Sequence, residues 1–509
     1  MLLNGEQYVG DIGYLAPEII LLIGGLFIFC LDLAYDPGVG KKSGLSYMAL
    51  SALFLTAALV AAVLQLNISD PEAGPKVAFS MMTIDNFGSF IKVTIFSAMI
   101  LTTIAGGRYM NRRSGNQGEF WTFFLMVSLA MSIAASANNL VLVYLAIEFL
   151  SITSYMLAGF LRDNRRSNEA GLKYFLYGSI ASAVMLYGIS LLYGATGSLY
   201  LHDIAAAFSE IIGESTEISG LAFAGLPAML LILAGLGFKA SLAPFYQWAP
   251  DTYDGAPTPV ATYLSTASKA AAFAVLARFF IVAMASFQVN WVPVLAAFSI
   301  ITMTMGNLAA LRQSSVKRMI AYSSVAQAGY ILMGLVAVTS TSPSAMDGLN
   351  GVLLYLFAYL FTNVGAFLVV MALEETVNST HISAYRGLIK RAPWLAVMFT
   401  IFLLSLTGIP LTGGFFGKFY VFGAAIQRQY FWLAGIGMIN AGLAAFYYLR
   451  VVREMFFTHE GEGEVLDVPM ALQTSLLICT VATVWIGVYP SAVLDWVNTA
   501  SVQLLSVVP

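Results

Sequence analysis

Residues 235–248 read GLGFKASLAPFYQW, an apolar segment that carries Lys239 and, five residues later, Pro244. Proline and glycine leave backbone groups without helical partners, and at membrane depth protein or water must satisfy those groups. A charged side chain in such a segment is costly unless it faces a protein interior or a water-filled path. A lysine beside an interrupted helix is therefore typical of an ion site near the middle of a bilayer.

Two further apolar segments share this combination of a lysine and a helix interruption. Residues 257–273 read PTPVATYLSTASKAAAF, in which a Thr/Ser run precedes Lys269. Residues 408–422 read GIPLTGGFFGKFYVF, in which glycines precede Lys418 within a run too long for one straight span. We therefore predict three broken membrane helices.

The composition excludes an ordinary soluble protein. The 509 residues are 59% hydrophobic and 10% charged, with a mean hydropathy of +0.81. A net charge of −3 gives no indication of nucleic-acid binding. Cys30 and Cys479 lie in separate apolar runs, and His202, His381 and His459 lie in polar connections, so no disulfide, metal-ligand spacing or haem site is predicted. The N-terminus has no basic n-region, so a cleaved signal peptide is not predicted.

Apolar runs of spanning length recur from end to end. We place about fourteen helices, at residues 13–33, 45–66, 85–106, 119–137, 139–161, 169–194, 222–248, 257–284, 291–311, 317–339, 348–374, 394–427, 430–452 and 470–494. Alternate loops, beginning with the first, carry 16 basic residues, whereas the other loops carry only Lys76 and Arg428. By the positive-inside rule, the basic loops are cytoplasmic and both termini lie on the outer face.

The predicted fold is an all-α polytopic membrane protein in a single domain, 1–509. N-terminal helices occupy 1–118, a first repeat of helices 4–8 occupies 119–284, a second repeat of helices 9–13 occupies 291–457, and a C-terminal helix occupies 470–509. Lys239 and Lys418 fall on the fourth helix of their respective units. Because five is odd, the two units would insert in opposite orientations, as in many transporters with inverted repeats.

Six basic residues remain inside the predicted spans: Lys92, Lys173, Lys239, Lys269, Arg278 and Lys418. Glu148 adds a carboxylate, and Tyr144, Ser151 and Tyr155 lie on its helical face. Burial of an amine disfavours its charged form and a nearby carboxylate restores it, so a Glu148–Lys239 pair could switch between proton-loaded and unloaded states. The alternative is a buried structural ion pair.

The remaining candidates each carry an alternative interpretation. Thr262, Ser265 and Lys269 share one helical face, where the hydroxyls could hold a water wire or could simply satisfy the broken backbone. Lys418 is either an interior proton site or a side chain that snorkels to an interface. Lys173 lies near a span end, where a structural pair competes with a relay role. We interpret Lys92 and Arg278, which are also near span ends, as structural or interfacial.

Four long strings carry a resemblance to a known family. They are 140–160 (LVLVYLAIEFLSITSYMLAGF), 236–276 (LGFKASLAPFYQWAPDTYDGAPTPVATYLSTASKAAAFAVL), 314–330 (SSVKRMIAYSSVAQAGY) and 405–420 (SLTGIPLTGGFFGKFY). The chain resembles the antiporter-like subunits of the proton-pumping NADH:quinone oxidoreductase, respiratory complex I, over nearly its whole length. Lys418 favours the subunit N type, since the similar M type has glutamate there. The long C-terminal extension of the L type has no counterpart.

The resemblance implies a proton relay through Glu148, Lys239, Lys269 and Lys418, and it matches Lys173 to a sixth-helix lysine of this subunit type. One position departs from the pattern, because many relatives have histidine where this chain has Gln327. Glutamine cannot titrate, although it can orient water. Any relay through this position would therefore depend on water.

The implied function is proton translocation driven by quinone reduction elsewhere, by a translocase subunit without a redox centre. NADH, FMN, iron–sulfur clusters and quinone would bind other subunits. The implied partners are a neighbouring antiporter-like subunit, small membrane subunits and the lipid of a bacterial cell membrane. The alternatives are a subunit of an Mrp-type cation/proton antiporter, a subunit of an energy-converting hydrogenase, and a solute importer, which would need a substrate-sized pocket.

Overall fold

A computed structural model of the chain describes residues 11–34, 44–68, 75–213, 220–338, 347–457 and 466–506. Some predictions fall on residues outside these ranges. They include the loop basic residues Lys41 and Lys42, His459, and part of the 195–221 connection.

The described residues form helices and one short antiparallel hairpin, in which Lys76 pairs with Ile84. In chain order the elements are α2 (Ala16–Ala34), α3 (Gly44–Ile68), β1 (Lys76–Ala78), β2 (Met82–Ile84), α4 (Asn86–Arg113), α5 (Gln117–Ser136), α6 (Leu140–Ala158), α7 (Arg165–Thr196), α8 (Leu201–Gly213), α9 (Gly220–Ala240), α10 (Trp248–Gly255), α11 (Thr258–Ser265), α12 (Ala267–Arg278), the π-helical turn η1 (Phe279–Ala283), the 3₁₀ turn η2 (Ala285–Phe287), α13 (Gln288–Leu311), α14 (Val316–Val336), α15 (Gly348–Thr376), the 3₁₀ turn η3 (Ile382–Tyr385), α16 (Leu388–Arg391), α17 (Pro393–Thr407), α18 (Gly413–Gln427), α19 (Phe431–Phe457), α20 (Met470–Val488) and α21 (Ser491–Leu505).

The prediction of an all-α polytopic membrane protein is confirmed. Among the described residues, 12 helical stretches are long and apolar enough to cross a membrane. Shorter apolar helices at Ala224–Ala240 and Pro393–Thr407 take the places of the seventh and twelfth predicted spans. Every predicted span therefore coincides with a helix. The division into two inverted repeats stays a prediction.

Several short elements lie outside the predicted spans, among them the three helices α8, α10 and α21, because spanning length was the signal used to place helices. α10 occupies the predicted 249–256 loop, and α8 lies in the 195–221 connection. α21 follows the last predicted span and packs on α4 and α15. It buries Val493, Val497 and Ala500 on one face, at the spacing of an amphipathic helix.

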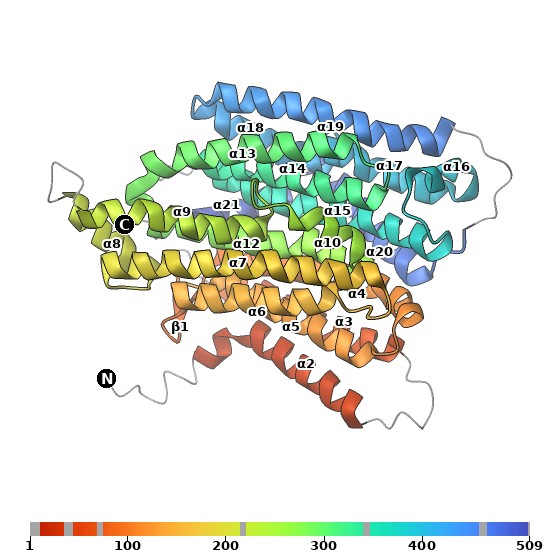
Figure 1. Ribbon diagram of the computed structural model, residues 1–509, viewed down its shortest axis with the longest axis horizontal. Helices are drawn as coiled ribbons and strands as arrows, with labels where there is room; N and C mark the ends of the chain where they lie inside the picture. Colours follow the sequence, from red (N-terminus) through yellow and green to blue (C-terminus); the bar gives the residue numbers. More distant parts are fainter. Residues whose placement is uncertain are drawn as a thin grey trace.

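The long helices run side by side, and their connections gather at two ends (Figure 1). The start of α2, the hairpin and α8 lie at the left end in Figure 1, and α10 and α16 lie toward the right. α11, α12, α14 and α15 are buried almost throughout, whereas α2, α7 and α19 expose large apolar side chains. The broken helix α11–α12 therefore runs through the interior of the bundle, and the outer helices present a lipid-compatible surface.

The three predicted helix interruptions are confirmed. α9 ends at Ala240, and Ser241 follows with a positive φ of 59°. The indole of Trp248 donates to the freed carbonyl of Phe238 at 2.9 Å. A second break separates α11 from α12 at Thr266, and a third separates α17 from α18 at Gly408. Each break thus brings backbone polar groups into the interior of the bundle, close to a lysine.

Candidate functional site

Lys239 is held at the end of α9 by two hydroxyl groups. Its amine is buried and donates to the Ser151 hydroxyl at 3.2 Å and to the Tyr174 hydroxyl at 3.0 Å. The Tyr174 ring stacks on Trp248 with ring centroids 4.1 Å apart, which fixes the position of that hydroxyl. The amine of Lys239 therefore has neutral oxygen atoms as partners, and stacked aromatic rings hold one of them in place.

Glu148 lies one turn before Ser151 on α6 and is half-buried. Its carboxylate accepts a hydrogen bond from Ser182 of α7. The predicted polar stripe on α6 is therefore present, since Ser151 contacts Lys239 from the face that carries Glu148. Ser151 is the contact of Lys239 on α6, and Glu148 lies one turn before it on the same helix.

Lys269 lies in the first turn of α12, directly after the break, and is fully buried. Its amine donates to both the carbonyl and the hydroxyl of Ser324 on α14, the latter at 3.1 Å. Close by, the Ser268 hydroxyl and the amide oxygen of Asn363 are buried without a hydrogen-bond partner in the described part of the chain. Buried polar groups without a hydrogen-bond partner lower the stability of the fold unless a water molecule or a transferred proton binds to them.

The hydroxyls before Lys269 satisfy the broken backbone. Thr262 donates to the Thr258 carbonyl at 2.8 Å, and Ser265 donates to the Thr262 carbonyl at 2.8 Å. Ser265 also accepts from the Asn363 amide at 2.8 Å, so α15 is linked to the break. The interpretation in which these hydroxyls support the backbone is therefore the arrangement observed, and each oxygen retains capacity to accept a further bond.

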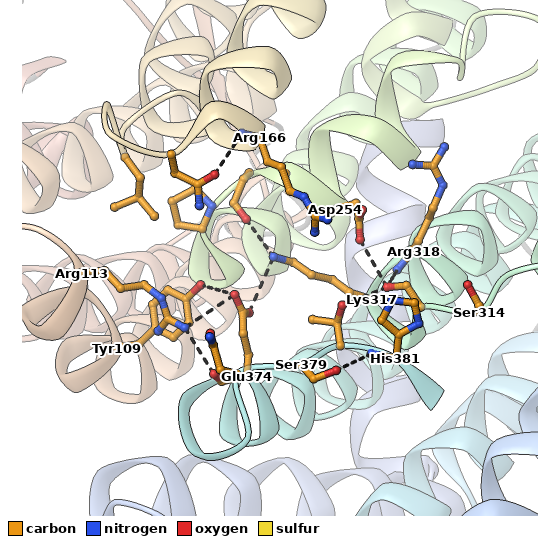
Figure 2. Close-up of a pocket in the computed structure, with 18 residues that line it drawn as sticks. Tyr109, Arg113, Arg166, Asp254, Ser314, Lys317, Arg318, Glu374, Ser379 and His381 are labelled. Carbon is orange, nitrogen blue, oxygen red and sulfur yellow. Dashed lines mark hydrogen bonds and ion pairs between the residues drawn. The ribbon is translucent and has the colours of Figure 1, made fainter. Parts of the chain in front are cut away.

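A cavity of about 520 Å³ opens at the end of the bundle where the basic loops converge. Figure 2 shows Tyr109, Arg113 and Lys317 converging on Glu374 at its wall. Tyr109 donates to the Glu374 carboxylate at 2.9 Å, and Thr258 donates to its other oxygen. Thr258 is the first residue of α11, so the cavity meets the polar side of the helix that leads to Lys269.

Lys418 is buried against the end of α17. Its amine donates to the carbonyls of Leu406 and Thr407 at 2.9 and 2.8 Å. These carbonyls belong to the last turn of α17, where no helical donor remains for them. The turn requires Gly408, because its φ is +94° and an added Cβ would lie 2.8 Å from Cδ of Lys418. Lys418 is therefore an interior amine, and it does not snorkel to an interface.

Gln327 links the surroundings of Lys269 with those of Lys418. Its amide donates to the Leu406 carbonyl at 3.0 Å, the same oxygen that Lys418 contacts, and it accepts a hydrogen bond from Tyr355. Gln327 lies one turn beyond Ser324 on α14, and Ser324 holds Lys269. A polar path of short steps therefore runs from Lys269 to Lys418.

The structure places Lys173 apart from the three buried lysines at the helix breaks. It is 39% exposed and contacts Glu169 and Asp251, each at 2.8 Å. Asp251 also contacts Arg318 at 2.6 Å. Burial acts to raise the pKa of Asp251, but the Lys173 hydrogen bond and the Arg318 charge outweigh it and hold that pKa below its ordinary value.

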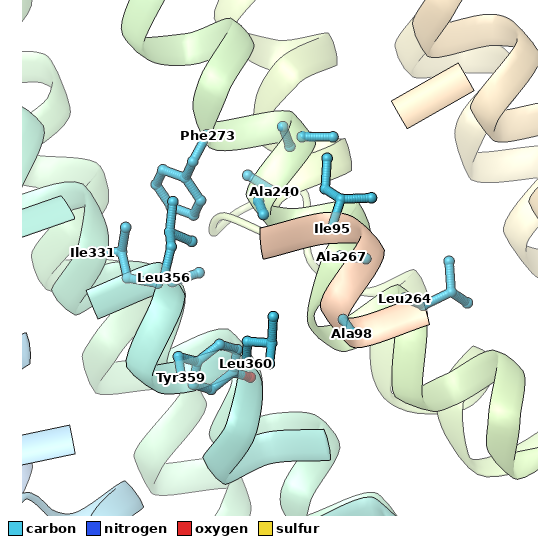
Figure 3. Packing of buried hydrophobic residues seen from close by; sticks show 14 of the residues in the cluster. Ile95, Ala98, Ala240, Leu264, Ala267, Phe273, Ile331, Leu356, Tyr359 and Leu360 are labelled. Carbon is cyan, nitrogen blue, oxygen red and sulfur yellow. The ribbon is translucent and has the colours of Figure 1, made fainter. Parts of the chain in front are cut away.

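Lys92 and Arg278 are neutralised by carboxylates deep in the bundle. Lys92 contacts Glu18 at 2.7 Å, and Arg278 contacts Asp85 at 2.6 Å, with all four side chains nearly inaccessible. They are buried ion pairs and not interfacial groups, which resolves that alternative. Buried apolar side chains of α4, α12, α14 and α15 also belong to one core cluster, as Figure 3 shows for Ile95, Phe273, Ile331 and Leu356.

Sequence reasoning missed the groups around the cavity and around Gln327. Glu374 and Lys317 were ordinary charges near span ends, and Tyr355 was one aromatic residue among many. No pattern in the sequence distinguishes them, since their contacts join helices far apart in the chain. Within the described residues, no group of three or more histidine, cysteine, aspartate or glutamate side chains is placed to hold a metal ion.

Comparison with known proteins gives a consistent set of sequence relatives. Residues 137–444 match the family described as "NADH:quinone oxidoreductase/Mrp antiporter, TM". The chain is 38% identical over 491 residues to NADH-quinone oxidoreductase subunit N 1 of Solibacter usitatus, covering 96% of each chain. It is 37% identical over 488 residues to subunit N of Desulforamulus reducens, covering 96% of this chain and 98% of the relative.

Solved structures with the same fold come from more than one kind of complex. A chain of respiratory complex I from Thermus thermophilus with bound aureothin is 29% identical, with a TM-score of 0.76, covering 94% of this chain and 98% of that one. Chains of the archaeal membrane-bound sulfane sulfur reductase and of the Mrp complex from Dietzia have TM-scores of 0.84 and 0.83 at 23% and 19% identity, each comparison covering 98% of both chains. The fold alone does not separate these complexes, whereas sequence identity favours the first.

Proposed function

This chain belongs to the NADH:quinone oxidoreductase/Mrp antiporter family, and from that premise we propose that it is the proton-translocating subunit N of an NADH:quinone oxidoreductase membrane arm. The relatives named subunit N match nearly its full length at 37–38% identity. The Mrp and sulfur-reductase chains are below 25% identity and support the fold only. The chain acts within a translocase, and we propose that the redox centres belong to other subunits of the complex.

One observation carries the proposal: three buried lysines lie beside three helix breaks, and each contacts neutral oxygen atoms. Lys239 contacts hydroxyls, Lys269 contacts a hydroxyl and a carbonyl, and Lys418 contacts carbonyls. An ammonium group without a counterion is costly in a low-dielectric interior. Such a group can release its proton and accept another, which a permanently paired lysine cannot do easily.

We propose that protons are taken up from the cavity at the basic end of the bundle. Glu374 at the cavity wall accepts a hydrogen bond from Thr258, and the hydroxyls of Thr262 and Ser265 follow along α11 to Lys269. These oxygens can accept bonds from water molecules along that face. The cavity would then supply the proton that protonates Lys269.

Transfer between the two halves would follow α14. Lys269 is bound to Ser324, Gln327 lies one turn further, and Gln327 shares the Leu406 carbonyl with Lys418. Because an amide neither gains nor loses a proton near neutral pH, Gln327 would orient water for the transfer. Lys418 would then hold the proton before its release.

The energy would arrive through Glu148. This carboxylate is half-buried on α6 and is bound by Ser182, while Ser151 on the same face holds Lys239. A shift of the carboxylate toward or away from the amine would raise or lower the proton affinity of Lys239. Neighbouring membrane-arm subunits would drive that shift, and the half-buried position of Glu148 leaves it within reach of a partner.

The proposed location is a bacterial cell membrane, with the basic end of the bundle and its cavity in the cytoplasm and both termini on the outer face. The partners would be an adjacent antiporter-like subunit, small membrane subunits and lipid. NADH, FMN, iron–sulfur clusters and quinone would bind other subunits of the complex.

The proposal is tested with Glu148→Gln, Lys239→Ala and Lys418→Ala in the whole complex, reconstituted in liposomes. Proton uptake is followed with an internal pH dye during NADH:quinone turnover. We expect proton transport to fall at least about tenfold and quinone reduction to fall with it, since a tightly coupled machine stalls. Assembly should be retained, because in the described part of the chain none of the three side chains forms a close ion pair whose other member would be left behind.

The matched control is Lys390→Ala, which removes an exposed lysine at the basic end and should leave both rates unchanged. Wild-type stoichiometry and rate in the three site variants would overturn the proposed relay. Isolation of the chain within an antiporter that lacks a quinone-reducing arm would favour the Mrp alternative.

A further inference from the structure

The buried pair formed by Arg278 and Asp85 lies at one end of α12, the helix that carries Lys269. Arg278 ends α12, and Asp85 caps the start of α4. Two parallel hydrogen bonds join them at 2.8 and 2.6 Å, and the third guanidinium nitrogen donates to the Ala135 carbonyl at 3.0 Å. One Asp85 oxygen also accepts from the Gly88 amide at 2.7 Å. Both side chains are at most 6% exposed.

This pair lies on the far side of Lys269 from the cavity. α4 begins at Asp85 and carries Tyr109 of the cavity wall near its other end. Arg278 follows Lys269 by nine residues on α12, about 14 Å along a helix. A proton on Lys269 therefore has two directions open to it, straight along α12 toward Arg278 or sideways toward Gln327.

A guanidinium group ends a chain of proton transfers. It has five hydrogen-bond donors and no acceptor, and it keeps its proton at any ordinary pH. A hydrogen-bonded proton path needs members that both accept and donate, and Arg278 cannot accept. The Asp85 carboxylate is held in the same pair, and three of its roughly four lone-pair sites already accept from Arg278 and the Gly88 amide.

The space beside Arg278 offers little room for water. The adjoining void measures about 10 Å³ and is otherwise lined by apolar side chains such as Leu236, Val275 and Phe279. A cavity needs about 10–15 Å³ to hold a single water molecule, together with polar partners. This void is therefore at the lower limit of the space that one water molecule needs, and Arg278, the charged side chain in its lining, cannot relay a proton.

α18, the helix that carries Lys418, ends differently from α12. Lys418 is followed after ten residues by Arg428 at the end of α18. Arg428 is exposed and donates to the Val338 carbonyl at 2.9 Å. The two helices thus carry an arginine at corresponding places, buried and paired with a carboxylate in the first and exposed in the second.

We propose that the Arg278–Asp85 pair is a proton plug, which closes the outer end of the first half and directs protons from Lys269 sideways to Lys418. The plug rests on the proposed relay and adds a direction to it. Without such a block, a proton at Lys269 could cross the bundle without passing the second half, and the gradient would leak.

The test compares Arg278→Gln with Asp85→Asn in the assembled complex in liposomes. Passive proton influx under an imposed pH gradient is measured without NADH, followed by protons pumped per NADH. Both variants break the same ion pair, but only Arg278→Gln removes the group that cannot accept a proton. We expect influx to rise about tenfold in Arg278→Gln, the change for a barrier lowered by about 1.4 kcal/mol, with NADH oxidation continuing and fewer protons pumped. Asp85→Asn should stay at the wild-type leak.

The double variant Asp85→Asn/Arg278→Gln covers the case in which the single change does not assemble, because it leaves no buried charge and should leak as well. A wild-type leak in every variant without Arg278 that assembles would overturn the plug. Equal leaks in Asp85→Asn and Arg278→Gln would also overturn it, since that is the result of a purely structural pair.

The double variant Lys269→Ala/Arg278→Gln distinguishes failure of the plug from failure of the proposed relay through Lys269. If Lys269 carries the leaking proton, the combined variant returns to the wild-type leak. If the leak persists in the combined variant, Arg278 still blocks a proton path, but that path does not use Lys269.

Discussion

Two groups of buried cations in this bundle are stabilised in different ways. Lys92 and Arg278 each contact a carboxylate at 2.6–2.7 Å, deep between α2, α4 and α12. Lys239, Lys269 and Lys418, at the helix breaks, contact hydroxyls and carbonyls. The first group is neutralised by opposite charge, and the second is solvated by dipoles.

The difference separates a structural role from a proton-carrying one. An ion pair favours the charged form of both partners, so its amine or guanidinium stays protonated. Dipoles stabilise the ammonium less strongly, and burial disfavours it. The helix breaks supply these dipoles, since they expose backbone carbonyls such as those of Leu406 and Thr407 at membrane depth.

The largest expected effect is on assembly of the complex, which should fail when a cation of the first group is replaced and be normal when one of the second group is replaced. Lys92→Met removes the partner of Glu18 and leaves a buried carboxylate unpaired, which costs about 3–5 kcal/mol. We expect little of the subunit to remain in assembled complex, measured by quantitative native gels of membranes. Lys269→Met leaves no carboxylate behind, so assembly should be normal while proton transport is lost.

A double variant sharpens the same comparison. Glu18→Leu combined with Lys92→Met replaces the buried pair by apolar side chains, a change that is often neutral for stability. Assembly should therefore return toward the wild-type amount. If Lys92→Met assembles as well as Lys269→Met, the two groups of cations do not differ in the way described.

The sequence identified the lysines at the breaks because glycine, proline and charge are visible one residue at a time. The i+3 spacing of Glu148 and Ser151 also placed both on one face of α6. The contact from Lys239 to Ser151 could not be predicted, since it joins residues 88 positions apart. Lys173 matched its family position, yet its pairing with Asp251 depends on how α10 packs on α7.

Other contacts have no sequence signature at all. Gln327 and Lys418 meet at a backbone carbonyl, whose position depends on the left-handed turn at Gly408. Asp85 and Arg278 are 193 positions apart and belong to separate predicted units of the chain. Partners of this kind follow from tertiary packing, which a single sequence does not encode in any local pattern.

A smaller effect is expected where the neutral partner itself is changed. Gln327→His keeps a donor for the Leu406 carbonyl and an acceptor for Tyr355, so proton transport should stay within about twofold of wild type. Gln327→Leu removes both bonds and leaves the buried Tyr355 hydroxyl without its acceptor, a cost of about 1–3 kcal/mol, whereas the Leu406 carbonyl keeps Lys418, and transport should fall about tenfold. Both are measured as protons pumped per NADH. An assembled Gln327→His complex with no activity would refute the water-relay interpretation of this position.

The smallest effect is expected at Lys173, which has ion-pair partners and for which the sequence left a relay role and a structural role open. The pKa of Asp251 is lowered, so the stabilisation from this network is present above the ordinary pKa of an aspartate and is lost only as the pH falls through the lowered value. Lys173→Ala removes one of two cations beside Asp251, and Arg318 remains. Partly exposed pairs contribute about 0–1 kcal/mol, so proton transport should change less than about twofold.

The pH profile distinguishes the two roles of Lys173. Without the lysine, the pKa of Asp251 moves up toward its ordinary value, where the carboxylate is still ionised between about pH 6 and pH 8. The profile of proton transport over that range should therefore be that of the wild-type complex. A tenfold loss, or a profile shifted within this range, would place Lys173 with the proton-carrying amines. It would also show that an exposed ion pair does not exclude a lysine from the relay.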